Sequence, residues 1–364
     1  MKIKLHHPSQ VANGSLTITG SKSESNRLLV LQALFPQIEI QNLSNSDDSK
    51  VTQEGLKSKG NIIDIHHAGT AMRFLTAYFA TRSNKEIILT GSQRMQERPI
   101  KLLVKALKSL GADITYQKEV GFPPLIIKGK EIFKNLVSLP ANISSQYISA
   151  LMLIAPSLKR GLTIDLIGET TSVPYIKMTQ SILDKLGIES DFDGGKITVQ
   201  PQTSIEPIRW TVESDWSSAS YFYSIVVLAA KSEIILNNYL EESKQGDADL
   251  SVIYEKLGVK TSYIDGKIKL TKLEGFTPPS YLSLNLKNTP DLAQTIAVTC
   301  LGMQIQCNLT GLHTLKIKET DRLKALKIEI EKLGGKVNIT DTSFELIDSS
   351  KIKSNISIDT YNDH

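Results

Sequence analysis

Apolar residues recur along this chain in two helical patterns that alternate with each other. In the first pattern one face is apolar, the other carries Lys and Glu, and the helix stops at a Leu-Gly dipeptide before a β-like run. Glycine there favours the left-handed backbone with which helices commonly end, and a one-sided helix is expected on the outside of a fold. This pattern occupies the segments 100–116, 178–192, 250–270 and 322–346, with stops at Gly111, Gly187, Gly258 and Gly334.

The second pattern is apolar nearly all round and opens on small polar residues. A helix without a polar face is expected to be buried on all sides. These inner helices are predicted to start near Thr70, Ser145, Ser218 and Asp291, with an earlier one near Ser23.

Both patterns recur about every 75 residues, so each repeat offers an inner helix, an outer helix and short strands. The chain is therefore predicted to be an α/β protein. The interval from Ser23 to Thr70 is shorter, which predicts a shortened first unit. One further period after Asp291 reaches the last printed residue, so either the chain is truncated or the last repeat ends early as a cap.

Composition and charge exclude several classes of protein. The 364 residues are 40% hydrophobic, with 42 Lys and Arg against 38 Asp and Glu, and this balance is typical of a globular chain with room for more than one domain. A net charge of +4, spread along the sequence, argues against a nucleic-acid binder. The N-terminus has no signal-peptide core and no window is long and apolar enough for a membrane span, which predicts a soluble cytoplasmic protein.

Cysteine and histidine usage offers little chemistry. Cys300 and Cys307 are too few for a disulfide framework or a Cys-rich zinc site, and Cys300 closes an apolar run, as a small buried hydrophobe would. His66 and His67 are adjacent and diverge in either regular structure, so no metal site is predicted. Gln245-Gly-Asp247 is interpreted as a turn.

Basic residues stand beside the polar starts of the inner helices. A helix N-terminus presents unpaired N–H groups and a positive dipole, which suit phosphate or carboxylate, and a mixture of Lys and Arg indicates a ligand with more than one anionic group. The alternative is that the polar residues are ordinary N-caps and that the charges belong to solvated helix starts. The cations concerned are Lys22, Arg27, Arg73, Arg94, Arg98, Lys318 and Arg322.

Taken together and in order, these motifs resemble the EPSP synthase (3-phosphoshikimate 1-carboxyvinyltransferase) family of enolpyruvyl transferases. The resemblance covers the chain from end to end. The matching segments are Gly20-Ser-Lys-Ser-Glu-Ser-Asn-Arg27, Ala68-Gly-Thr-Ala-Met-Arg73, Arg94-Met-Gln-Glu-Arg-Pro99, Ser144-Ser-Gln146, Ser172-Val-Pro-Tyr-Ile176, Asp215-Trp-Ser-Ser-Ala-Ser220, Gln245-Gly-Asp247, Pro290-Asp-Leu-Ala293, Lys318-Glu-Thr-Asp-Arg-Leu323 and Thr360-Tyr-Asn-Asp-His364.

The resemblance implies a two-lobed, inside-out α/β barrel built from βαβαββ units, three in each lobe, with the last unit incomplete in this chain. The lobes are expected at 21–212 and at 1–20 with 213–364. It also implies that the lobes close on the substrates by induced fit.

The implied reaction moves the enolpyruvyl group of phosphoenolpyruvate to the 5-hydroxyl of shikimate 3-phosphate and releases phosphate, in the shikimate pathway of chorismate and aromatic amino acid biosynthesis. Ser23 and Arg27 would hold the shikimate carboxylate, and Gln146 and Tyr175 would help to seat that substrate. The remaining binding residues would be Ser144, Ser145 and Ser172 for its phosphate, Lys22, Gly69, Thr70 and Arg98 for phosphoenolpyruvate and its phosphate, and Arg322 for the phosphoenolpyruvate carboxylate.

For catalysis, the resemblance implies a base on the attacking hydroxyl and an acid for the enol methylene. Asp291 would be the base and Glu319 the acid, with Lys318 beside the hydroxyl and Lys22 near the leaving phosphate. A tetrahedral intermediate would form and collapse. No metal or organic cofactor is implied, the partners are the two small-molecule substrates, and a monomer is expected.

Three departures and two alternatives stay open. His67 stands where the family usually has Asn, the segment between Arg27 and His67 is short, and the Arg, the apolar helix and the further Lys expected after Tyr361-Asn-Asp-His364 are not in the printed sequence. UDP-N-acetylglucosamine enolpyruvyl transferase shares the fold and the donor, but its loop Cys has no counterpart outside Cys300 and Cys307. A non-catalytic anion-binding relative is the other alternative.

Overall fold

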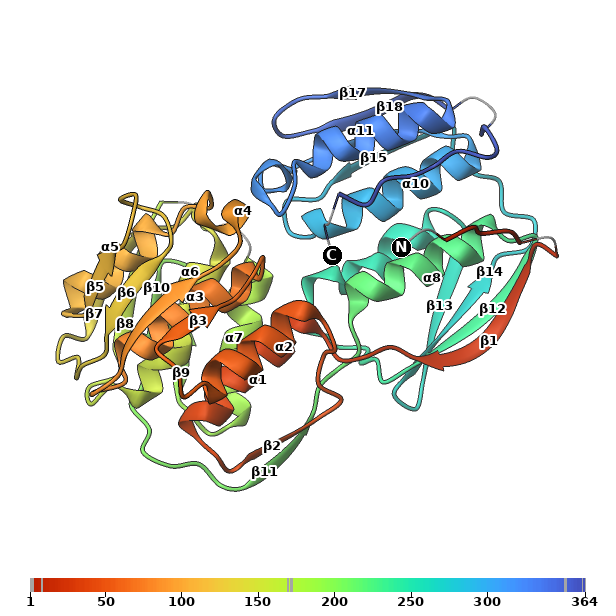
Figure 1. Cartoon of the computed structure of the whole chain (residues 1–364). Helices are drawn as coiled ribbons and strands as arrows, with labels where there is room; N and C mark the ends of the chain where they lie inside the picture. The colour runs from red at the N-terminus through yellow and green to blue at the C-terminus, as the bar shows by residue number, and fades with distance from the viewer. Residues whose placement is uncertain are drawn as a thin grey trace. The chain divides into compact units, whose positions relative to one another are not determined.

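The chain divides into two compact units. It begins in one unit, forms the whole of the other, and then returns to the first. The computed structural model describes residues 3–7, 9–168, 170, 173–349, 352–361 and 363. The amino-terminal unit is Thr19–Glu213, and the carboxy-terminal unit joins Met1–Ile18 to Ser214–His364. The lobes expected from the sequence were 21–212 and the remainder. Figure 1 labels the elements of both units.

One strand topology recurs in four four-stranded sheets of the described residues. In each sheet two neighbouring strands run parallel, and a later antiparallel hairpin joins the second of them. An inner helix connects the parallel pair and an outer helix leads to the hairpin, which makes the unit βαβαββ. The prediction of a repeated α/β unit is therefore confirmed.

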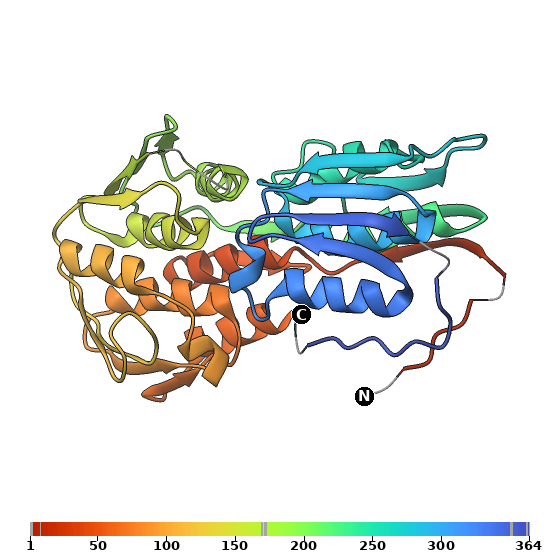
Figure 2. The same ribbon diagram turned by 90° about the horizontal axis from the view of Figure 1, so that it is seen from above.

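The amino-terminal unit holds two of these sheets (Figure 2). The first contains β3 (Ile62–Asp64), β4 (Glu86–Thr90), β6 (Leu125–Lys128) and β5 (Asp113–Tyr116). The second contains β7 (Leu136–Pro140), β8 (Leu162–Ile167), β10 (Lys196–Val199) and β9 (Ser190–Phe192).

The first unit is shortened because no hairpin follows its outer helix. Helix α1 (Lys22–Leu34) leads to β2 (Ile38–Gln41) and α2 (Asp47–Lys57), and the chain then passes directly to β3. The partner of β2 is β11 (Ile208–Thr211), which returns from the far end of this unit to pair in parallel. The missing hairpin accounts for the short interval between the first two inner helices.

The carboxy-terminal unit is formed by segments from both ends of the chain. Strand β1 (Val11–Thr17) pairs in parallel with β12 (Lys231–Asn237), so the whole amino-terminal unit is inserted between them. That sheet is completed by β14 (Lys267–Lys272) and β13 (Val259–Ile264), and the other by β15 (Tyr281–Asn285), β16 (Gln306–Thr310), β18 (Phe344–Ser349) and β17 (Gly335–Ile339).

The predicted glycine stops are confirmed. Gly111, Gly187, Gly258 and Gly334 all have positive φ, between +75° and +114°. They follow the outer helices α5 (Lys101–Leu110), α7 (Val173–Lys185), α9 (Leu250–Glu255) and α11 (Arg322–Leu333). Shorter helical turns are α4 (Gln93–Gln96), η1 (Ala155–Ser157), η2 (Gly246–Asp249), η3 (Pro290–Leu292) and η4 (Leu315–Ile317).

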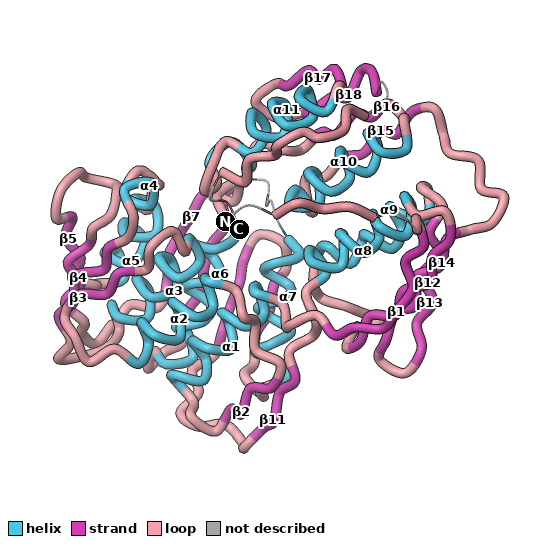
Figure 3. Tube along the Cα trace, turned by 45° about the vertical axis from the view of Figure 1, so that its right-hand side comes forward, coloured by secondary structure: helices cyan, strands magenta, loops and turns pink. Residues whose placement is uncertain are grey.

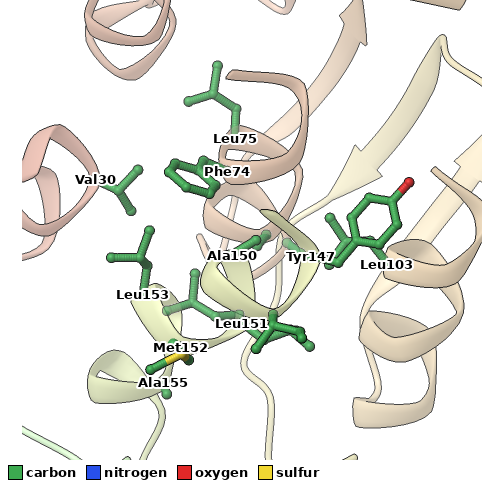
Figure 4. Close-up of a cluster of buried hydrophobic side chains, with 14 of the residues drawn as sticks. Val30, Phe74, Leu75, Leu103, Tyr147, Ala150, Leu151, Met152, Leu153 and Ala155 are labelled. Atoms are coloured by element: carbon green, nitrogen blue, oxygen red, sulfur yellow. The ribbon is translucent and has the colours of Figure 1, made fainter. Parts of the chain in front are cut away.

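The inner helices of the amino-terminal unit are buried as predicted. Helices α3 (Gly69–Ala80) and α6 (Ser145–Ile154) pack against each other and against α1, and Figure 3 shows the three grouped together. The core shown in Figure 4 gathers side chains from all three, among them Val30, Phe74 and Ala150. Three apolar helices can shield one another on every side.

The same prediction is wrong for the carboxy-terminal unit. Its inner helices are α8 (Trp216–Leu228) and α10 (Ala293–Met303), and α8 exposes Tyr221, Ile225 and Leu228, with Tyr221 at 62%. Val298 of α10 is exposed as well. Among the described residues of this unit, two inner helices pack together with no third one over them, so one apolar face stays uncovered. No helix in the described part of the chain is long and apolar enough to cross a bilayer.

Candidate active site

Arg27 lies in the middle of the amino-terminal unit and is held by neutral groups. Its Nε donates to Thr179 Oγ1 at 2.7 Å and its NH2 to Ser149 Oγ at 2.9 Å. Its NH1 donates to the carbonyl of Ser23 at 2.7 Å and its NH2 to that of Tyr175 at 3.3 Å. The residue is 2% exposed, and burial lowers its pKa to about 10. The structure thus brings together Ser23, Arg27 and Tyr175.

The start of α3 and Arg98 form a second group. A Cβ added to Gly69 would lie 2.7 Å from Arg98 NH1 and 2.9 Å from NH2, so only glycine lets the guanidinium pack against this backbone. Arg98 is buried. A guanidinium beside the first N–H groups of a buried helix is an arrangement suited to an anion.

Two further contacts connect this group to α6. Gln146 Nε2 donates to Thr70 Oγ1 at 3.3 Å, and Ser144 caps α6 by accepting from the Gln146 N–H at 3.4 Å. Ser145 is the first residue of α6 and is buried. Asp48, which sequence reasoning missed, accepts from the Thr70 N–H at 3.1 Å and so caps α3 from α2. Ser172, predicted for the same substrate, lies outside the described residues.

Arg73 and Arg94 differ in what they contact, and Arg94 fits the alternative of a solvated helix start. The guanidinium of Arg73 is buried and donates to the carbonyls of Gly69 and Pro99, both at 3.1 Å. It therefore ties α3 to the loop that carries Arg98. Arg94 is exposed and pairs with Glu97 at 3.3 Å, as an ordinary surface residue does. Lys22 opens α1 and is half-buried.

Arg322 is the centre of the site residues in the carboxy-terminal unit. Its NH1 donates to Asp291 Oδ1 at 2.8 Å and its NH2 to Glu319 Oε2 at 3.2 Å. Asp363 accepts from Nε and NH2, both at 2.8 Å. Lys318 Nζ lies 3.3 Å from Asp291 Oδ1. The predicted base, acid and two cations are therefore brought together.

Opposing effects act on the charge of Arg322. Burial by itself lowers the pKa, but the hydrogen bond to Asp363 and the charges of Asp291, Asp363 and Glu319 outweigh burial and raise the pKa above its ordinary value. Arg322 therefore stays charged, with its partners supplied by the protein.

Asp247 is a second residue that sequence reasoning missed, because its motif was interpreted as a turn. It lies in η2 and is buried, and its Oδ2 accepts from Ser217 Oγ at 2.5 Å. Its Oδ1 has no hydrogen-bond partner among the described residues. Burial, followed by the negative charge of Asp291, raises its pKa to about 7. A buried carboxyl near the Asp291 cluster can therefore carry a proton near neutral pH.

No described group of His, Cys, Asp and Glu side chains has the arrangement of a metal site. His67 Nε2 lies 3.7 Å from Asp47 Oδ2, and His66 Nδ1 lies 3.8 Å from Asp64 Oδ1. Both cysteines are free and buried, as predicted for Cys300.

The comparisons with known proteins agree with one another on one family. The model of EPSP synthase (3-phosphoshikimate 1-carboxyvinyltransferase) matches residues 49–364. A 3-phosphoshikimate 1-carboxyvinyltransferase of Bacteroides fragilis is 42% identical over 368 residues, covering 100% of this chain and 88% of the relative. One from Haemophilus influenzae is 34% identical over 390 residues, covering 98% and 89%. An EPSP synthase structure from Acinetobacter baumannii covers 94% of this chain and 83% of its own, with a TM-score of 0.71 at 19% identity, which supports the fold. The chain therefore belongs to the EPSP synthase family.

Proposed function

We propose that this chain transfers the enolpyruvyl group of phosphoenolpyruvate to the 5-hydroxyl of shikimate 3-phosphate and releases phosphate. Its relatives carry the name of this activity, and the family model matches most of the chain. The observation that carries the proposal is the Arg322 cluster, in which one guanidinium bonds to both Asp291 and Glu319. A base, an acid and a carboxylate-binding cation are the groups that this addition needs.

The amino-terminal unit would bind shikimate 3-phosphate. Arg27, with Ser23, would take the carboxylate, because the four hydrogen bonds of Arg27 go to uncharged acceptors. Ser144, Ser145 and Ser172 would take the phosphate at the start of α6, with Gln146 and Tyr175 seating the ring.

Phosphoenolpyruvate would bring its phosphate to Lys22, Gly69, Thr70 and Arg98 and its carboxylate to Arg322. The packing of Arg98 on Gly69 supports the first assignment, since guanidinium and helix N-terminus then act on the same anion. Arg322 is 11% exposed, so its bond to a carboxylate is weakly screened by water.

The reaction takes place in two steps. In the addition, Asp291 removes the proton of the 5-hydroxyl, the oxygen bonds to C2 of phosphoenolpyruvate, and Glu319 gives a proton to C3. In the elimination, the bond between C2 and the phosphate oxygen breaks, phosphate leaves, and C3 returns a proton to Glu319. Lys318, 3.3 Å from Asp291, would stabilise the charge that develops on the attacking oxygen, and Lys22 the charge on the leaving phosphate.

The proposal includes a monomer of the cytoplasm that uses neither a metal nor an organic cofactor and binds no nucleic acid. Sedimentation of the purified chain would check that it is a monomer. Activity in the presence of a chelator would check that it needs no metal.

A phosphate-release assay tests the reaction. Phosphate should appear with phosphoenolpyruvate and shikimate 3-phosphate and not with UDP-N-acetylglucosamine as acceptor. In calorimetry, Arg27→Ala and Ser145→Ala should each weaken shikimate 3-phosphate binding by roughly 1.5 to 3 kcal/mol, the worth of a hydrogen bond to a charged group. Release with neither acceptor would leave the chain a non-catalytic anion binder, and unchanged affinity in both variants would move the shikimate 3-phosphate site elsewhere.

A further inference from the structure

The guanidinium of Arg322 presents two pairs of N–H donors, one formed by Nε and NH2 and the other by NH1 and NH2. The protein bonds to these two edges differently. Asp363 takes the edge formed by Nε and NH2 with both of its oxygens, each at 2.8 Å. Asp291 and Glu319 each accept one bond, from NH1 and NH2, at 2.8 Å and 3.2 Å. A bidentate pair fixes the plane of a guanidinium, whereas single bonds leave it free to turn.

The bidentate pair is also well buried. The side chains of Arg322, Asp363 and Glu319 are 11%, 13% and 9% exposed, and that of Asp291 is 27% exposed, so it is the bidentate geometry that distinguishes Asp363 from Glu319. A charged pair with little water around it is weakly screened. Arg has many rotamers, so an arginine that recognises a planar carboxylate benefits from being fixed in advance.

We infer that Asp363 is a positioning residue that orients Arg322 for the carboxylate of phosphoenolpyruvate. Asp363 occupies the Nε edge, so the substrate carboxylate would take the NH1 and NH2 edge by replacing the single bonds to Asp291 and Glu319. The inference rests on the role proposed above for Arg322. It assigns no contact between Asp363 and the substrate.

The segment that carries Asp363 is attached to α11 independently. Tyr361 donates its hydroxyl to Glu329 Oε1 at 2.5 Å, and Lys332 Nζ donates to Asp359 Oδ2 at 2.7 Å. The Asp359 side chain is 69% exposed, so its ion pair contributes little. Asp359→Asn therefore removes a carboxylate from the same segment without touching Arg322, which makes it a matched control.

Steady-state kinetics of the full chain test the inference. Asp363→Asn puts an amide nitrogen against an arginine donor, so the KM for phosphoenolpyruvate should rise about 10-fold, roughly the loss of one charge-assisted bond. The value of kcat should change by less than about 3-fold, and shikimate 3-phosphate affinity should stay within about 2-fold, since catalytic groups and the other site are kept. Asp363→Glu should recover part of the KM, and Asp359→Asn should match the parent.

The Arg322→Gln variant distinguishes a failure of the positioning role from a failure of the proposed function. If Arg322→Gln raises the KM for phosphoenolpyruvate but Asp363→Asn leaves it unchanged, the positioning role is wrong and the proposed function stands. A lower KM in Asp363→Asn would also overturn the inference, because it would mean that Asp363 competes with the substrate carboxylate. If Arg322→Gln itself has no effect on KM, the proposed carboxylate site is wrong, and the inference fails with it.

Discussion

Arg27, in the second turn of α1, is buried, and Arg322, the first residue of α11, has a side chain that is 11% exposed, yet the surroundings of the two are opposite. Arg27 is bonded to two hydroxyls and two carbonyls, and burial lowers its pKa to about 10. Arg322 is bonded to three carboxylates, whose charges outweigh burial and raise its pKa. One unit of the protein thus holds a cation through neutral hydrogen-bond acceptors, with Glu24 as a weaker charge nearby, and the other holds a cation through three carboxylates.

Under the proposed function, the difference amounts to two ways of preparing an anion site. A cation with neutral partners carries the cost of burial in the empty protein, and an anionic ligand relieves that cost on binding. A cation held by acids is stable when empty, and the acids are at hand for proton transfer. The contrast can be tested at each arginine.

The largest effect is expected when Arg322 is replaced by methionine, and the same change at Arg27 is its comparison. Arg322→Met leaves Asp291, Glu319 and Asp363 close together without their common partner, and should lower the free energy of unfolding by about 3 kcal/mol. Arg27→Met should cost less than about 1 kcal/mol, because it removes a desolvated charge and the hydroxyls of Ser149 and Thr179 still bond to each other. Urea unfolding measures both, and equal losses would contradict the contrast.

A second test leaves Arg322 in place and changes its acids. Asp291→Asn and Glu319→Gln should each lower kcat by ~10²-fold, because an acid or base acts in the transition state, while shikimate 3-phosphate binding stays within a few-fold. Asn and Gln keep the shape and can still accept from Arg322, so packing changes little. Near-normal kcat in either variant would make that residue a substrate-positioning group.

The third test uses a carboxyl on the same helix whose charge acts on Arg27. Glu24 accepts from Trp210 Nε1 at 2.7 Å, and burial, with a smaller effect of Glu213, raises its pKa from 4.5 to about 7. The folded protein therefore holds this proton more tightly than the unfolded chain. The stability that Glu24 contributes is complete below pH 4.5 and is lost as the pH rises through about 7.

Glu24→Gln should remove that loss, because Gln stays neutral and can still accept from Trp210. The free energy of unfolding of the variant relative to the parent should rise by on the order of 2 kcal/mol between pH 4.5 and pH 8. Glu39→Gln, on the exposed face of β2, controls for the loss of a surface charge. A difference that does not change with pH would show that the pKa of Glu24 is the same in the folded and the unfolded protein.

The smallest effect concerns one neutral partner of Arg27. Thr179→Val keeps the shape but removes the acceptor of the Arg27 Nε–H. Thr76→Val is the matched control, since Thr76 is equally buried and its hydroxyl bonds to the Met72 carbonyl in its own helix. Thr179→Val should cost about 1 kcal/mol more than Thr76→Val in urea unfolding. Equal costs would mean that Thr179 does not stabilise the guanidinium.

Part of this architecture could be predicted because it depends on local sequence. The amphipathic pattern of α5 and α11, and the glycine stops at Gly111 and Gly334, follow from helix periodicity and from the left-handed backbone that glycine permits. The short first interval has a local reason as well, since no hairpin follows α2. Cations beside polar helix starts were likewise visible as neighbours in the sequence.

The sequence by itself determined the repeating α/β unit, its helix ends and the residue types available for binding anions. Only the tertiary structure decided which of those residues share partners: that Arg73 braces a loop, that Asp363 reaches Arg322, and that Asp247 is buried near Asp291. It also decided that α8 keeps an uncovered apolar face. The physical reason is that periodicity is set by residues three or four positions apart, whereas burial and charge pairing depend on side chains that distant segments bring together.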